Sequence, residues 1–174
     1  MRIIRTIGAD DEPAARTRLV RMLKTDPDIE VVAECRNGAE ALETIRKENI
    51  ELVYLDIQMP QINGLDLVGK FPPENMPYVV FVTAHDRYAL KAFDLNAVDY
   101  LLKPYDDERF FTSLARAKEL VEMRYNKRLT GRLMDLMQDH MKVRKDFTEV
   151  FVIKEKGREY KVPVKDVLFI RAEG

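Results

Sequence analysis

Five side chains able to bind a metal ion and a phosphoryl group stand at or just after the ends of short apolar segments. They are Asp10, Asp11, Asp56, Thr83 and Lys103. The segments are typical of β-strands, and the carboxyl ends of parallel strands gather at the edge of an α/β sheet where ligands bind. We therefore expect three carboxylates, one hydroxyl and one ammonium group to meet in a small cleft.

The three acids predict a divalent cation. Unit charges about 4 Å apart repel by about 4 kcal/mol at an effective dielectric constant near 20, so an unneutralised cluster would be unstable. Carboxylate, carbonyl and water oxygens favour Mg²⁺, with Mn²⁺ as an alternative. We expect Asp11 and Asp56 to bind the ion directly and Asp10 to hold a coordinated water. The backbone carbonyl of Gln58 would add another oxygen ligand.

Asp56 is the expected nucleophile, because a carboxylate can form an acyl phosphate while a metal ion neutralises the incoming phosphoryl group. Lys103 can pair with one phosphoryl oxygen and Thr83 can donate a hydrogen bond to another. Pro104 follows Lys103, which raises the expectation of a cis peptide bond at this position. Any one of these residues alone would favour a structural role, but their joint placement at successive strand ends favours phosphoryl transfer.

The elements that must position these residues alternate along the first part of the chain. Apolar segments typical of strands are expected at residues 3–8, 31–33, 52–55, 78–82 and 98–102. Helical patterns occupy residues 14–24, 39–47, a short segment reaching about residue 70, and 86–94. Alternating strands and helices indicate βαβ units. The expected fold is α/β, a doubly wound five-stranded parallel sheet.

The remainder of the chain is helical and then rich in strand signals. Residues 107 to about 143 read as helix, with an apolar stripe that breaks at 124–128 and resumes at Leu129. The second half of this helix is expected to be a linker or a dimer contact. Strands are expected at 147–153 and 162–170, as a hairpin or the start of a β-rich unit. The expected organisation is a domain at 1–120, a linker helix at 121–145, and at 146–174 the first strands of an incomplete domain.

Composition excludes several classes of protein. The 174 residues are 46% hydrophobic and 34% charged with a formal net charge of −1, so no overall basic field points to nucleic acid. Cys35 is the only cysteine, which rules out an internal disulfide and a cysteine-based zinc site. No apolar run approaches the length of a membrane span and the start does not resemble a signal peptide. We expect no membrane association and a cytoplasmic location.

Four motifs resemble those of the receiver domain of two-component response regulators, a flavodoxin-like fold. They are Asp10-Asp11-Glu12-Pro13, Leu55-Asp56-Ile57-Gln58-Met59-Pro60 with Gly64, Val82-Thr83-Ala84, and Tyr100-Leu101-Leu102-Lys103-Pro104. The resemblance covers residues 1 to about 120. It implies a CheY-like receiver that is phosphorylated by a partner protein and is not itself an enzyme.

Two further stretches are similar to the branch of this family with LytTR-type (LytR/AlgR) DNA-binding domains. One is residues 88–100, and the other is the tail, where 151–153 and 162–174 look like the opening strands of that domain. The resemblance implies a transcription regulator whose LytTR domain is cut early in this chain. Only the full-length protein is then expected to bind DNA.

The resemblance also implies a role for each residue of the expected cleft. Asp56 accepts a phosphoryl group from a sensor histidine kinase, Asp10 and Asp11 bind Mg²⁺, and Thr83 and Lys103 contact the phosphoryl oxygens. Tyr100 occupies the position of a switch aromatic, which turns inward when the threonine moves. Phosphorylation would then favour a homodimer through the surface formed by the fourth helix, fifth strand and fifth helix. Gln58 and His85 lie where the family tunes the lifetime of the acyl phosphate.

Two alternatives remain open at this point. The chain could be a receiver that acts only through protein–protein contacts, without DNA. It could also be a phosphatase of the haloacid-dehalogenase type, which likewise uses an aspartate nucleophile, a lysine and Mg²⁺. That class requires Asp-x-Asp with the nucleophile on the first strand, whereas Asp10 and Asp11 are adjacent and Asp56 follows the third strand. Neither G-x-G-x-x-G nor a P-loop occurs, so nucleotide binding has no support.

Overall fold

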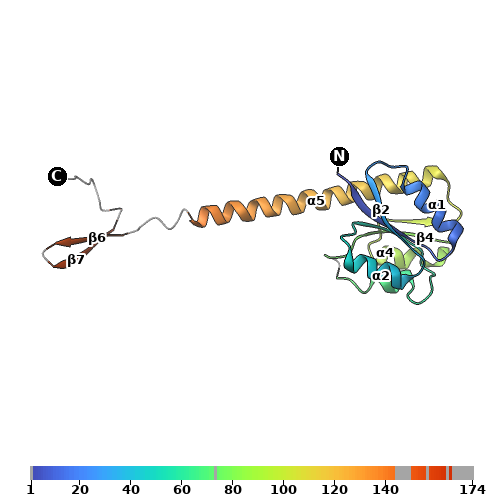
Figure 1. Cartoon of the computed structure of the whole chain (residues 1–174), viewed down its shortest axis with the longest axis horizontal. Helices are drawn as coiled ribbons and strands as arrows, with labels where there is room; N and C mark the ends of the chain where they lie inside the picture. The colour runs from blue at the N-terminus through green and yellow to red at the C-terminus, as the bar shows by residue number, and fades with distance from the viewer. Residues whose placement is uncertain (1, 73, 144–149, 156, 164, 166–174) are drawn as a thin grey trace. The chain divides into compact units, whose positions relative to one another are not determined.

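The computed structural model describes residues 2–72, 74–143, 150–155, 157–163 and 165 (Figure 1). Contacts divide the chain into two units, Met1–Tyr125 and Asn126–Gly174. The first unit contains the predicted α/β sheet. No helix within the described ranges is long and apolar enough to cross a membrane.

The sheet of the first unit has five parallel strands in the order β2-β1-β3-β4-β5. The strands are β1 (Ile4–Ala9), β2 (Ile29–Cys35), β3 (Leu52–Leu55), β4 (Tyr78–Thr83) and β5 (Asp99–Leu102). β3 is buried along its whole length, as expected for a parallel strand covered on both faces. The predicted doubly wound five-stranded parallel sheet is confirmed.

Helices cover both faces of this sheet (Figure 1). They are α1 (Pro13–Leu23), α2 (Gly38–Lys47), α3 (Gly64–Val68), the 3₁₀ turn η1 (Asp86–Tyr88), α4 (Ala89–Asp94) and α5 (Asp107–Val143). One buried cluster joins α1 and α5 to the sheet through residues such as Leu19 and Phe110. A second cluster joins α2, α3 and α4 through Ile45, Leu67 and Ala92. The predicted single helix at 86–94 is in fact the turn η1 followed by the short helix α4.

The pairing of the strands determines which side chains meet at their carboxyl ends. Ala9 of β1 pairs with Leu55 of β3, so the residues that follow them, Asp10 and Asp56, are neighbours. Thr83 of β4 pairs with Leu102 of β5, which places Thr83 beside the start of the Lys103 loop. The register of the sheet thus brings the predicted site residues to one edge.

The second unit contains the end of α5 and an antiparallel hairpin of β6 (Val150–Glu155) and β7 (Arg158–Pro163). β7 begins at Arg158, four residues before the strand predicted at 162–170, and overlaps that prediction at residues 162 and 163. Gly157 adopts a left-handed φ of 78°, which lets the chain reverse so that Arg158 pairs directly with Glu155. The expected strand residues 147–149 and 166–170 lie outside the described residues.

Candidate functional site

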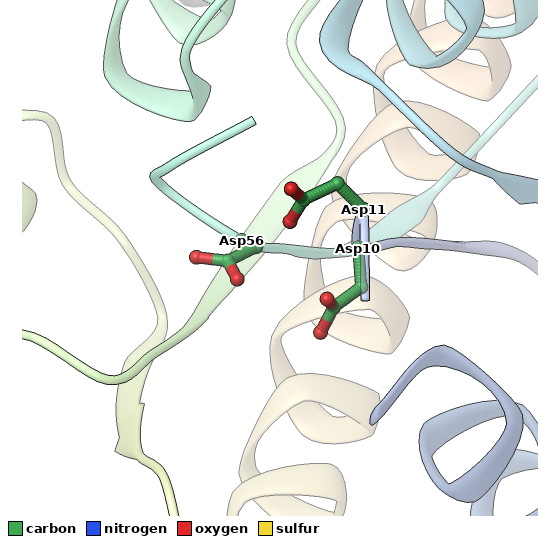
Figure 2. A group of neighbouring side chains, drawn as sticks. All are labelled: Asp10, Asp11 and Asp56. Carbon is green, nitrogen blue, oxygen red and sulfur yellow. The ribbon is translucent and has the colours of Figure 1, made fainter. Parts of the chain in front are cut away.

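Three carboxylates form a cluster at the carboxyl-terminal edge of the sheet (Figure 2). One oxygen from each of Asp10, Asp11 and Asp56 lies within 4.8 Å of the others. Asp10 and Asp56 are buried, with 1% and 7% of their surface exposed, whereas Asp11 is exposed. The cluster therefore has two acids at its base and one at its solvent side.

Local backbone hydrogen bonds hold the two buried carboxylates in place. The N–H of Glu12 donates to Asp10 Oδ1 at 3.0 Å, and the N–H of Gln58 donates to Asp56 Oδ1 at 3.1 Å. Each acid thus accepts a bond from the backbone two residues ahead, the pattern of an Asx turn. Gly64 packs against the same loop, and a Cβ at that position would lie 2.4 Å from the Asp56 carbonyl oxygen. Only glycine fits there without displacing the backbone of Asp56.

Lys103 bridges the two buried acids. Its Nζ lies 2.6 Å from Asp10 Oδ2 and 2.8 Å from Asp56 Oδ2. The backbone N–H of Lys103 donates to the carbonyl of Thr83 at 2.8 Å, which ties the loop to the end of β4. The peptide bond between Lys103 and Pro104 is cis, as the sequence predicts.

Among the described residues, three carboxylates meet at this edge, and Lys103 is the cation that forms ion pairs with two of them. Burial raises the pKa of Asp10 above its ordinary value of 3.8, despite the hydrogen bond and charge of Lys103. For Lys103, burial favours the neutral amine, but hydrogen bonds to Asp10 and Asp56 outweigh it and raise the pKa. A buried oxygen cluster with excess negative charge has the donor set that Mg²⁺ or Mn²⁺ prefers.

Thr83 and Tyr100 lie near the acid cluster, but neither forms a hydrogen bond with its carboxylates in the described structure. Thr83 is fully buried, and its Oγ1 has no hydrogen-bond partner among the described residues. Tyr100 is half-buried in β5, opposite Phe81 of β4, and its hydroxyl donates to the carbonyl of His85. An unpartnered buried hydroxyl is unfavourable unless something else accepts its hydrogen bond.

Sequence reasoning missed one contact beside the cluster. Gln58 Nε2 donates to the hydroxyl of Tyr88 at 3.3 Å, linking the β3–α3 loop to η1. The side chain of Arg87 lies over the Tyr88 ring and also donates to its hydroxyl, at 2.9 Å. An open cleft of about 710 Å³ is lined by Asp11, Gln58, Tyr88 and Lys91 among others. The stretch 88–100 begins at Tyr88, but nothing in it indicates the contact with Gln58, which depends on how the two loops meet in space.

Comparison with known proteins agrees with this geometry. The family described as response regulator receiver domain matches residues 7–115. The transcriptional regulatory protein BtsR of Escherichia coli K12 is 47% identical over 117 residues, covering 67% of this chain and 49% of that protein. An uncharacterized response regulatory protein of Yersinia pestis is 49% identical over 114 residues, covering 66% and 48%. The chain thus spans about half the length of the curated relatives it matches.

Solved receiver domains share the fold. The response regulatory domain of mrkE from Klebsiella pneumoniae superposes with a TM-score of 0.64 at 29% identity, covering 69% of this chain and 99% of that one. The REC domain of AraT, a response regulator from Geobacillus stearothermophilus, gives 0.63 at 33% identity, covering 71% and 98%. The sheet order, the acid cluster and the match over residues 7–115 lead to one conclusion: the chain belongs to the response regulator receiver family.

Proposed function

We propose that the chain is a phosphorylation-dependent switch in which Asp56 accepts a phosphoryl group from a sensor histidine kinase. One observation carries the proposal: Asp56 lies in a cluster with Asp10 and Asp11 and contacts Lys103. The carboxylate of Asp56 is the nucleophile, with the ammonium group of Lys103 on one side and the other two acids on the other. Phosphoryl transfer requires little beyond such positioning and charge neutralisation.

In the proposed transfer, a carboxylate oxygen of Asp56 attacks the phosphorus as the bond from phosphorus to the donor nitrogen breaks. Asp10, Asp11 and Asp56, with the backbone carbonyl of Gln58, would hold Mg²⁺, or Mn²⁺ in its place. The bound ion would neutralise charge on the phosphoryl oxygens. Lys103 already contacts Asp56 Oδ2, so a small movement of its ammonium group suffices to pair with a phosphoryl oxygen.

Thr83 and Tyr100 are the proposed link from this chemistry to the surface. The buried Thr83 hydroxyl lacks a hydrogen-bond partner in the described structure, so it is free to donate to a phosphoryl oxygen. Its movement would open space into which Tyr100 can turn. Exposed apolar side chains gather on the elements around Tyr100, namely Leu90 of α4, Leu102 of β5 and Phe111 of α5. They support a homodimer through the α4–β5–α5 surface.

The proposed output is a LytTR-type DNA-binding domain that begins near residue 146, after a receiver at 1–120 and a linker helix at 121–145. The resemblance of residues 151–153 and 162–174 to that domain supports it. So does the name of BtsR, a transcriptional regulatory protein of about twice the matched length. DNA binding is proposed for the full-length protein only, and with it a cytoplasmic location.

The two alternatives now differ in support. The first alternative is a receiver that acts through protein contacts alone, and full output after removal of residues 146–174 from the full-length protein would favour it. Receiver domains of transcriptional response regulators are not enzymes. The hypothesis of a haloacid-dehalogenase-type phosphatase therefore has no remaining support.

The test is the intact mass of the chain after incubation with acetyl phosphate and Mg²⁺. We expect one added phosphoryl group on the wild-type chain and none on Asp56→Asn. Asp94→Asn serves as the matched control, because Asp94 is an exposed aspartate at the end of α4. Size-exclusion chromatography of the same samples should show a shift toward dimer. Equal labelling of wild type and Asp56→Asn would refute the assignment of Asp56.

A further inference from the structure

The helix α5 carries two apolar stripes that point in different directions. The first consists of Phe110, Leu114, Ala117 and Val121, which are buried against the sheet. The second, here called the outer stripe, consists of Leu129, Leu133, Leu136 and Met137. Its side chains are 45%, 53%, 58% and 69% exposed. At 3.6 residues per turn, the centre of the outer stripe is rotated by roughly 110° from the first stripe.

This rotation means that the outer stripe does not continue the face that packs on the sheet. At 3.6 residues per turn, the positions that would continue the first stripe are Arg128, Arg132 and Asp135. Gly131 lies almost opposite the outer stripe, and a Cβ there would meet nothing within 4 Å. Glycine lowers helix stability, but on the far side of the helix it leaves the outer stripe intact. The outer stripe is therefore a separate apolar face with its own polar back.

The spacing of the outer stripe fits a helix partner. Asn126, Leu129, Leu133 and Leu136 are separated by three, four and three residues, the alternation of a and d positions in a coiled coil. Between residues 126 and 137 no charged residue falls within the sector that these side chains occupy. Arg132 flanks the sector, where its side chain can remain in water while covering apolar surface.

We infer that the outer stripe pairs with the outer stripe of a second copy of this chain, as a short parallel two-stranded coiled coil. Asn126 favours a second copy of the chain as the partner and a parallel orientation of the two helices. In a parallel, in-register pair, Asn126 faces Asn126 of the partner, and the two amides can hydrogen-bond. In an antiparallel pair centred on the leucines, Asn126 would face Leu136 and leave a polar group unpaired, which is unfavourable. A single polar residue at an a position is a known means of fixing register.

The area of the outer stripe determines when pairing occurs. Burying its four side chains would remove on the order of 400 Å² per helix, or about 800 Å² in total, against about 1,200–2,000 Å² for a stable interface. The stripe is therefore too small to hold two chains together alone and closes when the receivers also pair. In this respect the inference rests on the proposed function, because phosphorylation supplies the receiver contact. The expected result is an in-register helix pair that forms together with the phosphorylated dimer.

The test is disulfide cross-linking in the full chain, with a single cysteine placed at Leu129→Cys or, as the matched control, at Gly131→Cys. Cys35 is the only native cysteine and is buried, so it does not compete. We expect Leu129→Cys to cross-link to itself under mild oxidation, more strongly after acetyl phosphate and Mg²⁺, and Gly131→Cys to cross-link weakly. Equal cross-linking at both positions would overturn the inference. The inference would also be overturned if Leu129→Cys did not cross-link in a sample that is dimeric by size, because something else would then cover the outer stripe.

A second pair of variants measures the contribution of the stripe. Leu133→Glu should weaken dimerisation about tenfold or more, because it places a charge in the seam. Met134→Glu is the control, because Met134 is also exposed and adjacent but lies outside the outer stripe. Pairing through the outer stripe would be refuted if both variants weakened dimerisation equally or if neither variant weakened it. Intact mass is measured in parallel. A chain that takes up no phosphoryl group yet cross-links at 129 at high concentration refutes the proposed trigger and leaves the pairing supported.

Discussion

The two edges of the central sheet use charge in opposite ways. At the amino-terminal edge, two aspartates share one cation: Lys118 Nζ lies 2.8 Å from Asp26 and 2.7 Å from Asp28. At the carboxyl-terminal edge, Lys103 pairs with Asp10 and Asp56, and Asp11 adds a third carboxylate to the cluster. The first arrangement joins α5 to the start of β2. The second places one more carboxylate, that of Asp11, beside a pair that already shares its cation.

The pKa directions of the two edges express the same difference. Burial acts against ionisation of Asp26, but hydrogen bonds from Lys118 and from the Asp28 N–H outweigh it and hold the pKa below 3.8. At Asp10, burial prevails and the pKa is raised. Ionised Asp26 therefore stabilises the fold, whereas the ionised form of Asp10 is less stable in the fold than its neutral form. Functional sites commonly show such perturbed groups.

The largest effect is expected on metal affinity. The double variant Asp10→Asn with Asp11→Asn should have an affinity for Mg²⁺ that is lower on the order of 100-fold, because two of the three carboxylates lose their charge. The matched control at the other edge is Asp26→Asn with Asp28→Asn, which removes the same charge from a pair of aspartates. It should leave the affinity unchanged. Isothermal titration calorimetry measures both, and similar losses in the two double variants would contradict the distinction between the edges.

A smaller effect is expected on stability at the amino-terminal edge. Lys118→Met should lower the free energy of unfolding by about 1–2 kcal/mol, since Asp26 and Asp28 lose their shared, partly buried partner. Lys47→Met is the control, because Lys47 forms a solvent-exposed pair with Glu43 within α2. Urea denaturation of the three proteins gives the comparison. A Lys118→Met variant as stable as the control would show that these ion pairs do not hold α5 to the sheet.

The smallest expected effect has the opposite sign. In Mg²⁺-free buffer at pH 7, Asp10→Asn should raise the free energy of unfolding slightly, because burial raises the pKa of Asp10 and makes its charged form less stable in the fold than a neutral side chain. Asp26→Asn should lower it. Destabilisation by Asp10→Asn under these conditions would mean that Lys103 fully compensates the cluster.

The two single variants should also differ in their dependence on pH. The raised pKa of Asp10 gives a contribution to stability that is present below pH 3.8 and is lost as the pH rises through the folded-state pKa. The increase in the free energy of unfolding caused by Asp10→Asn should thus appear only as the pH rises. The lowered pKa of Asp26 gives a contribution that is present above pH 3.8 and is lost as the pH falls through its folded-state pKa. Parallel pH profiles for the two variants would contradict these directions.

The sequence predicted the sheet and the position of the acid cluster because both depend on strand ends. Once the strands are parallel, Asp10, Asp56 and Lys103 have to reach the same edge, and the pairing of Ala9 with Leu55 confirms it. The direct contacts of Lys103 with both buried acids follow from this register. Local patterns were enough for this part of the structure because the candidate site residues occupy defined positions in the strand order.

Features that depend on solvent-exposed or polar segments were predicted poorly. β7 begins at Arg158 and includes Glu159, so apolar alternation does not mark its start. The helix expected at 86–94 divides into η1 and α4, which side-chain periodicity over nine residues cannot resolve. The bond between Gln58 and Tyr88 joins residues 30 positions apart in two loops. Such contacts require the packed fold and leave no signal in local sequence.

We propose that the carboxyl-terminal edge of the sheet places a phosphoryl group on Asp56. The most direct test is to phosphorylate the chain with acetyl phosphate and Mg²⁺, reduce the acyl phosphate with borohydride, and locate the resulting homoserine by peptide mass. We predict homoserine at position 56 only, and none when Mg²⁺ is removed by chelation. Homoserine at position 10 or 11, or no homoserine in a folded chain with Mg²⁺ present, would contradict the account.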